Sequence, residues 1–260
     1  MAPPIGAHSL DLAGGVHAAW SNASRGDVRP SGHRSVDAAP LATLAGELAT
    51  ASGVPVTRVA WATQVHGVEV LEVETLEDDS ARLADGSEGA GSLTVSNLGE
   101  GDALVSARGG VAVCVLTADC GALALSSPEG VFAAVHVGWR GLVGGVIGAA
   151  VERMRLVGAT DVVGSLGPCI HTECYEFSTP DLDTVATTFG AGIRGRTSNG
   201  RPALDLTAGI GAALTMAGAT VVPGIDVCTA CGDGYFSHRA RRDVGRQALL
   251  VWGGASARSR

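Results

Sequence analysis

The 260-residue chain contains no lysine, because all 18 residues of its Lys+Arg count are arginine. Schiff-base chemistry, pyridoxal phosphate attachment and the lysine of a P-loop NTPase are therefore excluded. Aromatic residues are scarce at 4%, and 26 acidic residues outnumber the arginines to give a formal net charge of -8. A chain so poor in positive charge lacks the basic face of a general nucleic-acid binder. We expect no nucleic-acid partner, and any anion site must be local.

The first 15 residues have neither the basic segment nor the continuous apolar run that is typical of a secretory leader. This predicts a cytoplasmic protein whose six cysteines are thiols. Residues 206–225 carry no charge over a length that could cross a bilayer, but they are rich in Gly and Thr and contain Pro223. We expect a buried helix followed by a strand there, and no membrane partner.

What is present is a chain with 46% hydrophobic residues and 38 glycines, long enough to bury a large core without disulfides or a structural metal. We find no internal repeat and predict one domain over residues 1–260. Helical patterns over 38–52, 141–157 and 180–189 alternate with β-type runs within 54–74 and 111–137. The third helix has Ser178 or Thr179 as its predicted cap. This alternation predicts an α/β or α+β fold.

The run from Gly110 to Gly141 is the most informative part of the chain. It predicts strands over 111–117, 122–126 and 131–137, with a turn at 127–130 between the last two. If these two pair as a hairpin, the numbers of opposed residues sum to about 257, which sets Cys120 level with Val137 and beside His136. Side chains that oppose one another in such a pair lie about 5 Å apart, close enough to touch one ion.

A metal site at Cys120 and His136 requires a third ligand, and the best candidate is His66, at the end of another β-type run. Two imidazoles and one thiolate suit Zn²⁺, and three protein ligands leave its fourth position open for water or substrate. The same trio resembles a blue-copper site, but none of Met1, Met154 and Met216 is obviously placed as the axial ligand. We therefore predict zinc, with copper as the weaker alternative.

A metal-free hydrolase is a further alternative, with Cys120 as nucleophile, His136 as base and Asp119 nearby. Arg140 lies in the turn after the third strand, at the start of the predicted helix, where it could face an anion. The structural alternatives are a buried thiol, a core histidine and a surface arginine.

Three features in the C-terminal half are weaker indications of a binding site. The only basic cluster offers Arg239, Arg242 or Arg246 to a phosphate, and a solvated surface explains it equally well. The pair Cys228 and Cys231 forms a lone CxxC, which without a second pair is a weak zinc signal and lacks the context of a thioredoxin. A GxGxxG match over 190–195 follows a helix rather than a strand, so it does not predict a dinucleotide site.

Six motifs together carry a family resemblance. They are TQVHG, GDALVS, TADC, AAVHVGWRG, LGPCIHTECYEF and the closing CT...YFSHR...GRQ. In this order, over roughly residues 14–250, the chain resembles the YfiH family of laccase-domain proteins, first described as multicopper polyphenol oxidases. The resemblance implies a single-domain α/β sandwich with two β-sheets between helical layers. It also implies a zinc ion on His66, Cys120 and His136.

The activity implied by the resemblance is zinc-dependent phosphorolysis of adenosine, inosine, guanosine and methylthioadenosine, with adenosine deamination at the same site. Nucleoside and phosphate are the implied partners, and a monomeric protein is compatible with the resemblance. In this scheme Cys120 and His136 belong to the catalytic set. Arg140 holds phosphate, and Asp119 carries a proton or orients a metal-binding histidine. The alternatives are a peptidoglycan-editing amidase acting on muropeptide precursors, a copper-dependent polyphenol oxidase and a non-catalytic binding protein.

The chain departs from the family pattern at three places. No arginine precedes the segment Gly14-Gly15-Val16, and the candidates to replace that charge are Arg25, Arg29 and Arg34. Gly121-Ala122 replaces the usual proline after TADC, and His171 stands where glycine is common. We expect these changes to alter the shape of the pocket and its affinity for phosphate.

Overall fold

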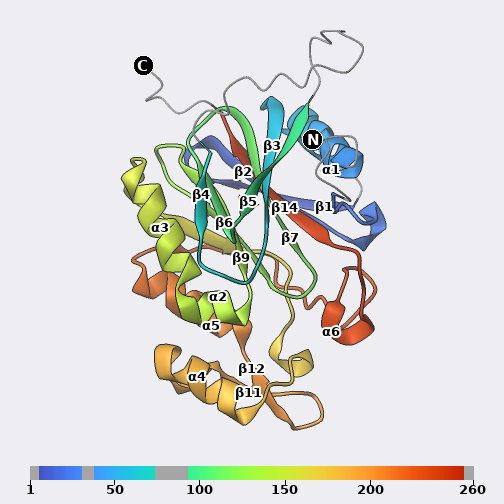
Figure 1. The fold of residues 1–260 in the computed structure, drawn as a ribbon, viewed down its shortest axis with the longest axis vertical. Coiled ribbons are helices and arrows are strands. Elements are labelled where there is room, and N and C mark those ends of the chain that lie inside the picture. Colours follow the sequence, from blue (N-terminus) through green and yellow to red (C-terminus); the bar gives the residue numbers. More distant parts are fainter. Residues whose placement is uncertain (1–5, 31–37, 74–92, 255–260) are drawn as a thin grey trace.

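The computed structural model describes residues 6–30, 38–73 and 93–254, and these residues form two six-stranded sheets that pack face to face between helices (Figure 1). The first sheet has the order β1-β2-β14-β7-β3-β5. Its strands are β1 (Ala7–Leu12), β2 (Val16–Ser21), β14 (Gln247–Gly253), β7 (Gly110–Thr117), β3 (Val56–Thr63) and β5 (Thr94–Glu100).

The second sheet has the order β13-β10-β8-β9-β6-β4. Its strands are β13 (Thr220–Val221), β10 (Val163–Leu166), β8 (Gly121–Ser126), β9 (Phe132–Val137), β6 (Ala103–Ser106) and β4 (Val70–Glu72). A two-stranded ribbon of β11 (Arg194–Arg196) and β12 (Pro202–Leu204) lies beside helix α4 (Thr179–Phe189) at one end of the molecule (Figure 1). The helices are α1 (Ala39–Ser52), α2 (Trp139–Gly144), α3 (Val146–Leu156), α4 (Thr179–Phe189), α5 (Leu206–Met216) and α6 (His238–Arg241).

The layers follow from the two-residue period of the strands. In β7, Val113 and Val115 belong to the core between the sheets, whereas Ala112 and Cys114 pack with α1 on the other face. In the second sheet, every second residue of β8 and β9 likewise faces the first sheet, and the others pack against α2, α3 and α5. The molecule therefore has four layers, helix, sheet, sheet and helix. This confirms the predicted α/β sandwich with two sheets between helical layers.

Two local predictions need correction. Residues 141–157 form two helices rather than one, because Gly145 adopts a left-handed conformation with φ 95° that ends α2 and begins α3. The hairpin of β8 and β9 exists, but Gly121 opposes Val137 and Ala122 opposes His136, so the register differs by one residue from the prediction. Cys120 therefore lies just before β8 and still beside His136.

Two other predictions are confirmed. Ser178 caps α4, and its side chain accepts a hydrogen bond from the Asp181 amide. Residues 206–225 contain α5, which is buried on one face, followed by β13. Within the described residues, no helix combines the length and the apolar character that crossing a bilayer requires.

Candidate active site

Three side chains with metal-binding atoms meet where strands of the second sheet end. His136 is the penultimate residue of β9, Cys120 directly precedes β8, and His66 lies in the loop between β3 and β4. Their ligand atoms all lie within 4.8 Å of one another, and Cys120 Sγ is 3.7 Å from His66 Nε2. The structure thus brings together the three residues that the sequence analysis named as metal ligands.

A buried carboxylate, Asp102, holds two of the three residues in place. The paired residues of β6 and β9 place Asp102 opposite His136, and His136 Nδ1 lies 2.7 Å from Asp102 Oδ1. The same carboxylate accepts hydrogen bonds from the amides of Val65, His66 and Gly67, at 3.2, 3.0 and 2.7 Å. With Nδ1 engaged, His136 has Nε2 left for a metal.

His66 is held in an unusual backbone conformation, with φ 60°. The three amide bonds to Asp102 stabilise this tight turn, which a non-glycine residue rarely adopts. A neighbouring glycine makes room for the imidazole: a Cβ on Gly138 would lie 2.5 Å from His66 Cδ2. Two local features therefore fix the position of this ring.

The charges of the site favour a thiolate at Cys120. Burial raises the pKa of the Cys120 thiol, but the charge of His136 and hydrogen bonds to both histidines outweigh it and lower that pKa to about 6. Burial lowers the pKa of His136, but the Cys120 thiolate and Asp102 outweigh it and raise that pKa to about 9. A thiolate is the form of cysteine that binds metals and attacks electrophiles.

Asp102 is itself kept ionised. Burial raises the pKa of this carboxyl, and the hydrogen bonds from His136 and from the amides of Gly67 and Val65 lower it below its ordinary value. A buried carboxylate that accepts several N–H bonds fits the role of orienting a metal-binding histidine. The sequence analysis had considered Asp119 for that role.

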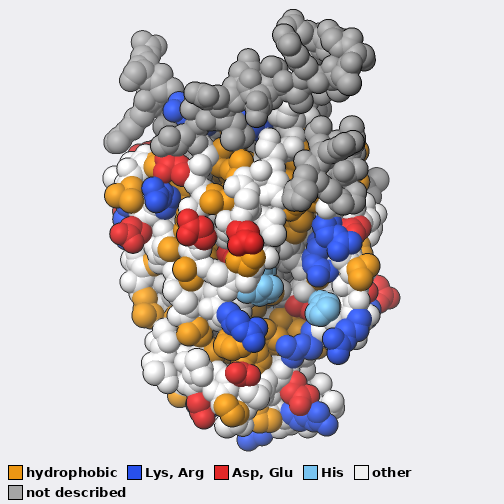
Figure 2. All heavy atoms as spheres, viewed as in Figure 1, with side chains coloured by type: hydrophobic (Ala, Val, Ile, Leu, Met, Phe, Trp, Pro, Cys, Tyr) orange, Lys and Arg blue, Asp and Glu red, His pale blue; other side chains and the backbone are white. Residues whose placement is uncertain are grey.

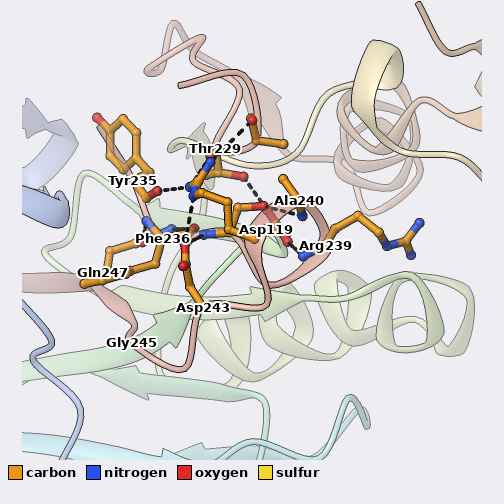
Figure 3. Close-up of polar contacts among 12 residues, drawn as sticks. Asp119, Thr229, Tyr235, Phe236, Arg239, Ala240, Asp243, Gly245 and Gln247 are labelled. Carbon is orange, nitrogen blue, oxygen red and sulfur yellow. Dashed lines mark hydrogen bonds and ion pairs between the residues drawn. The ribbon is translucent and has the colours of Figure 1, made fainter. Parts of the chain in front are cut away.

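Asp119 instead anchors the segment before β14 (Figure 3). Its Oδ1 accepts a hydrogen bond from the Thr229 hydroxyl at 2.7 Å, and its Oδ2 accepts one from the Arg239 amide at 2.6 Å. The carboxylate bonded to His136 is that of Asp102, so the suggestion that Asp119 orients a metal-binding histidine is corrected. Asp119 connects the Cys120 turn to the loop that carries Arg239.

A cavity of about 690 Å³ opens over the three candidate ligands and has an arginine-rich wall. Arg140 lines it, together with Arg29, Arg239 and Arg246. On the face shown in Figure 2, arginine side chains gather around exposed histidine atoms. Within the described ranges, no acidic side chain forms an ion pair with Arg140, whose guanidinium lies 4.4 Å from the centre of the Trp139 ring.

The arginines considered from sequence separate into two groups. Arg239 and Arg246 reach the cavity, whereas Arg242 does not line it. Of the three residues considered as replacements for the missing N-terminal arginine, Arg29 lines the cavity and Arg25 pairs with Glu47 at 2.7 Å. Arg34 lies outside the described residues.

Apolar and neutral polar groups complete the cavity. Three aromatic rings contribute to its lining, those of Trp61, Trp139 and Tyr175. The Trp139 ring packs edge-on against the Phe177 ring, with 5.4 Å between the ring centres. Thr117 also lines the cavity, and its buried hydroxyl has no hydrogen-bond partner among the described residues. A ligand with a flat ring, hydroxyl groups and a negative charge would find a partner for each part.

Comparisons with known proteins agree with this architecture. The sequence matches the family described as multi-copper polyphenol oxidoreductase laccase over residues 31–253. It is 36% identical over 247 residues to purine nucleoside phosphorylase ORF3 of Streptomyces griseus, covering 93% of this chain and 92% of that protein. It is 38% identical over 210 residues to purine nucleoside phosphorylase SCO2081 of Streptomyces coelicolor, covering 79% and 80% of the two chains.

Solved structures show the same fold. The protein NMB0706 of Neisseria meningitidis superposes with a TM-score of 0.70 at 23% identity, covering 96% of this chain and 99% of that one. YfiH of Bacillus licheniformis superposes with a TM-score of 0.69 at 21% identity, covering 91% of this chain and 92% of that one. From the sequence match over most of its length, the chain belongs to the multi-copper polyphenol oxidoreductase laccase family.

Proposed function

We propose that this protein is a zinc-dependent purine nucleoside phosphorylase acting on adenosine, inosine, guanosine and methylthioadenosine. The observation that carries the proposal is one cavity that combines the His66, Cys120 and His136 donor atoms with a wall of arginines. The relatives from two Streptomyces species that are named purine nucleoside phosphorylases support it.

The donor set fits zinc. Two imidazole nitrogens and one thiolate are borderline-soft ligands, and three of them leave one position for a reactant. When bound, zinc supplies a Lewis acid that polarises an oxygen ligand in that position. Copper fits less well, because neither Met154 nor Met216 lines the cavity to serve as the weak axial ligand of a blue-copper site.

The other residues of the cavity bind and orient the substrates. We assign phosphate to Arg140, whose planar guanidinium can donate two parallel hydrogen bonds, with Arg29, Arg239 or Arg246 adding positive charge. We assign the purine to the aromatic wall, where Trp61, Trp139 or Tyr175 can stack on it. The unpaired Thr117 hydroxyl is available to a sugar or base.

The reaction follows from this arrangement. An oxygen of hydrogen phosphate forms a bond to ribose C1′ while the bond between C1′ and the purine nitrogen breaks, and the base leaves with the electron pair. The proton lost by hydrogen phosphate balances the proton gained by the base. The chain contributes by fixing the two reactants next to each other and by neutralising charge with its arginines. In this scheme Asp119 positions the Arg239 loop.

We further propose adenosine deamination at the same site, since it requires a purine held in the same cavity and a water in place of phosphate. The cytoplasm predicted from the sequence would keep the cysteines reduced, and all six are free in the structure. This state suits a site that depends on the Cys120 thiolate.

The test is a base-release assay with the metal content measured on the same sample. Protein purified without added metal is incubated with inosine, with and without phosphate, and hypoxanthine and ribose 1-phosphate are separated by chromatography. We expect the parent protein to form both products only when phosphate is present. We expect Cys120→Ser to lose both the products and the zinc bound in the cavity. The matched control is Cys114→Ala, which removes a buried thiol from the α1 side of the first sheet.

The outcomes separate the alternatives. Release of an amino acid from muropeptide precursors, with no base released from any nucleoside, would replace the phosphorylase with an amidase. Turnover of Cys120→Ser equal to that of the parent protein would refute the site. Hydrolysis by metal-free protein would favour Cys120 as the nucleophile with His136 as its base.

A further inference from the structure

A second cluster of metal-binding side chains lies apart from the cavity. It consists of Glu173, Cys174, Cys228 and Cys231, whose ligand atoms all lie within 4.8 Å of one another. Cys174 Sγ is 3.3 Å from Cys231 Sγ, and Cys231 Sγ is 3.3 Å from Glu173 Oε1. None of the four residues lines the cavity over His66, Cys120 and His136.

The backbone brings these residues together from two distant segments. Glu173 and Cys174 belong to the short 3-10 helix Thr172–Cys174, and the other two cysteines lie 54 or more residues later, in the loop after β13. Cys169 and Cys228 form an isolated parallel bridge, in which the Thr229 amide donates to the Cys169 carbonyl at 3.0 Å. The cluster is therefore set in place by main-chain pairing.

The geometry points to a second, structural zinc site with the Cys174, Cys228 and Cys231 thiolates and the Glu173 carboxylate as its four ligands. Two sulfurs at about 2.3 Å from a tetrahedral zinc lie about 3.8 Å apart. The observed 3.3 Å between Cys174 and Cys231 is close to that value, so small rotations of side chains suffice. Four protein ligands close the coordination sphere, as in structural rather than catalytic zinc sites.

The surroundings suit bound thiolates. The His171 amide donates to Cys228 Sγ at 3.4 Å, which stabilises negative charge on that sulfur. Magnesium and calcium are excluded by the soft sulfur donors.

The site would brace one wall of the cavity. Thr229 lies between the two cysteines of the CxxC, and its hydroxyl donates to Asp119 at 2.7 Å (Figure 3). Tyr175, next to Cys174, lines the cavity. A metal that joins Cys174 to Cys228 and Cys231 would thus fix Tyr175 and the Asp119 anchor relative to each other.

The experiment counts zinc in protein purified without added metal, by mass spectrometry of the metal. We expect about two zinc ions per chain in the parent protein and about one in either Cys120→Ser or Cys231→Ser. The double variant should hold almost none, and Cys114→Ala should keep both. Cys231 is exposed, so its replacement leaves no hole in the core.

A second measurement does not depend on that variant. Cys120→Ser is stripped of metal with a chelator and reloaded with Co²⁺, and its absorption is recorded. Three thiolates should give strong sulfur-to-cobalt charge transfer that vanishes in Cys120→Ser/Cys231→Ser. Its absence in the folded Cys120→Ser protein would overturn the site.

Two further results would also overturn the proposal. One is a parent protein whose zinc is lost entirely with Cys120→Ser. The other comes from counting free thiols in the denatured protein without reduction. A count two thiols short of the six cysteines would show a disulfide between Cys174 and Cys231. Because Cys120→Ser tests the cavity and Cys231→Ser tests the cluster, failure of one site is distinguishable from failure of the other.

Discussion

Asp102, which directly precedes β6, faces His136 of the adjacent strand β9, with 2.7 Å between Asp102 Oδ1 and His136 Nδ1, and both side chains are buried. Cross-strand neighbours of this kind keep a fixed separation because the sheet sets it. The pair holds the imidazole with its Nε2 free for a ligand.

The first prediction is that Asp102→Asn weakens zinc binding at the cavity by about 10–100-fold, because the imidazole loses the carboxylate that orients it and makes it basic. Competition with a chelator measures the affinity. Asp11→Asn is the matched control, since Asp11 pairs with His17 at the same 2.7 Å on the surface. Equal affinity in folded Asp102→Asn and the parent protein would contradict the role.

The second prediction concerns the space beside His66. In Gly138→Ala the new Cβ would lie 2.5 Å from the His66 ring, which must therefore move. A displacement of about 1 Å at a catalytic centre can cost about 100-fold in rate, and we expect a loss of this order in kcat/KM for inosine. Gly148→Ala in α3 is the control, because its Cβ meets nothing within 4 Å. Full activity in Gly138→Ala would show that His66 can shift freely.

The third prediction is that Arg140→Ala raises the KM for phosphate by roughly 10- to 100-fold, since a hydrogen bond to a charged group contributes about 1.5–3 kcal/mol. The KM for the nucleoside should change far less. Arg155→Ala serves as the control, because Arg155 lies on α3 outside the cavity, where it donates a hydrogen bond to the Gly218 carbonyl. A parallel rise in both constants would instead indicate a general disturbance of the cavity.

The fourth prediction concerns stability at low pH. Hydrogen bonds from the Thr160 hydroxyl and amide lower the pKa of Glu129 to about 2. Because this pKa lies below the ordinary value of a glutamate, the ionised group stabilises the fold fully above pH 4.5, and that stabilisation is lost as the pH falls toward 2.

Urea unfolding of the parent protein and Glu129→Gln at several pH values tests this. The difference in unfolding free energy between them should shrink as the pH falls from neutrality to about 3. Glu152→Gln, on the exposed face of α3, should track the parent at every pH. A constant difference for Glu129→Gln would rule out the proposed linkage.

Much of the architecture could be predicted from sequence, for physical reasons visible in β7 and β8. Their alternating residues supply two separate cores, so both strands are apolar on both faces and could be predicted as buried strands. The two sheets between helical layers came from the family resemblance. The one-residue error in the hairpin register arose because the connection spans residues 127–131 rather than 127–130, so Ser126 opposes Phe132. The break at Gly145 was missed because isolated glycines are tolerated inside helices.

The candidate site was predicted less completely. Cys120 and His136 are joined by a hairpin and could be placed together. His66 was named as the best third ligand because it ends another β-type run, but no spacing rule placed it near the other two. Asp102 was missed because its pairing with His136 depends on the order of strands in the second sheet. A signal was present, since it is the one charged residue in the GDALVS motif, directly before a buried strand.

The CxxC cluster shows a different limit. Cys228 and Cys231 were set aside because a second pair was missing, and the residues that complete the group, Glu173 and Cys174, belong to a short helix far away in the sequence. The pairing of the segments around Cys169 and Cys228 brings them together. Spacing rules detect metal sites built within one segment, and this one spans two.

The turn at His66 has a consequence for the order of events in assembly. Its three main-chain amides donate hydrogen bonds to the Asp102 carboxylate, which also orients the ring of His136. The folded chain therefore positions both imidazoles before a metal ion binds. Loading therefore costs little further loss of conformational entropy. The metal-free protein should therefore have the same structure as the metal-bound protein, with its ligands already in position.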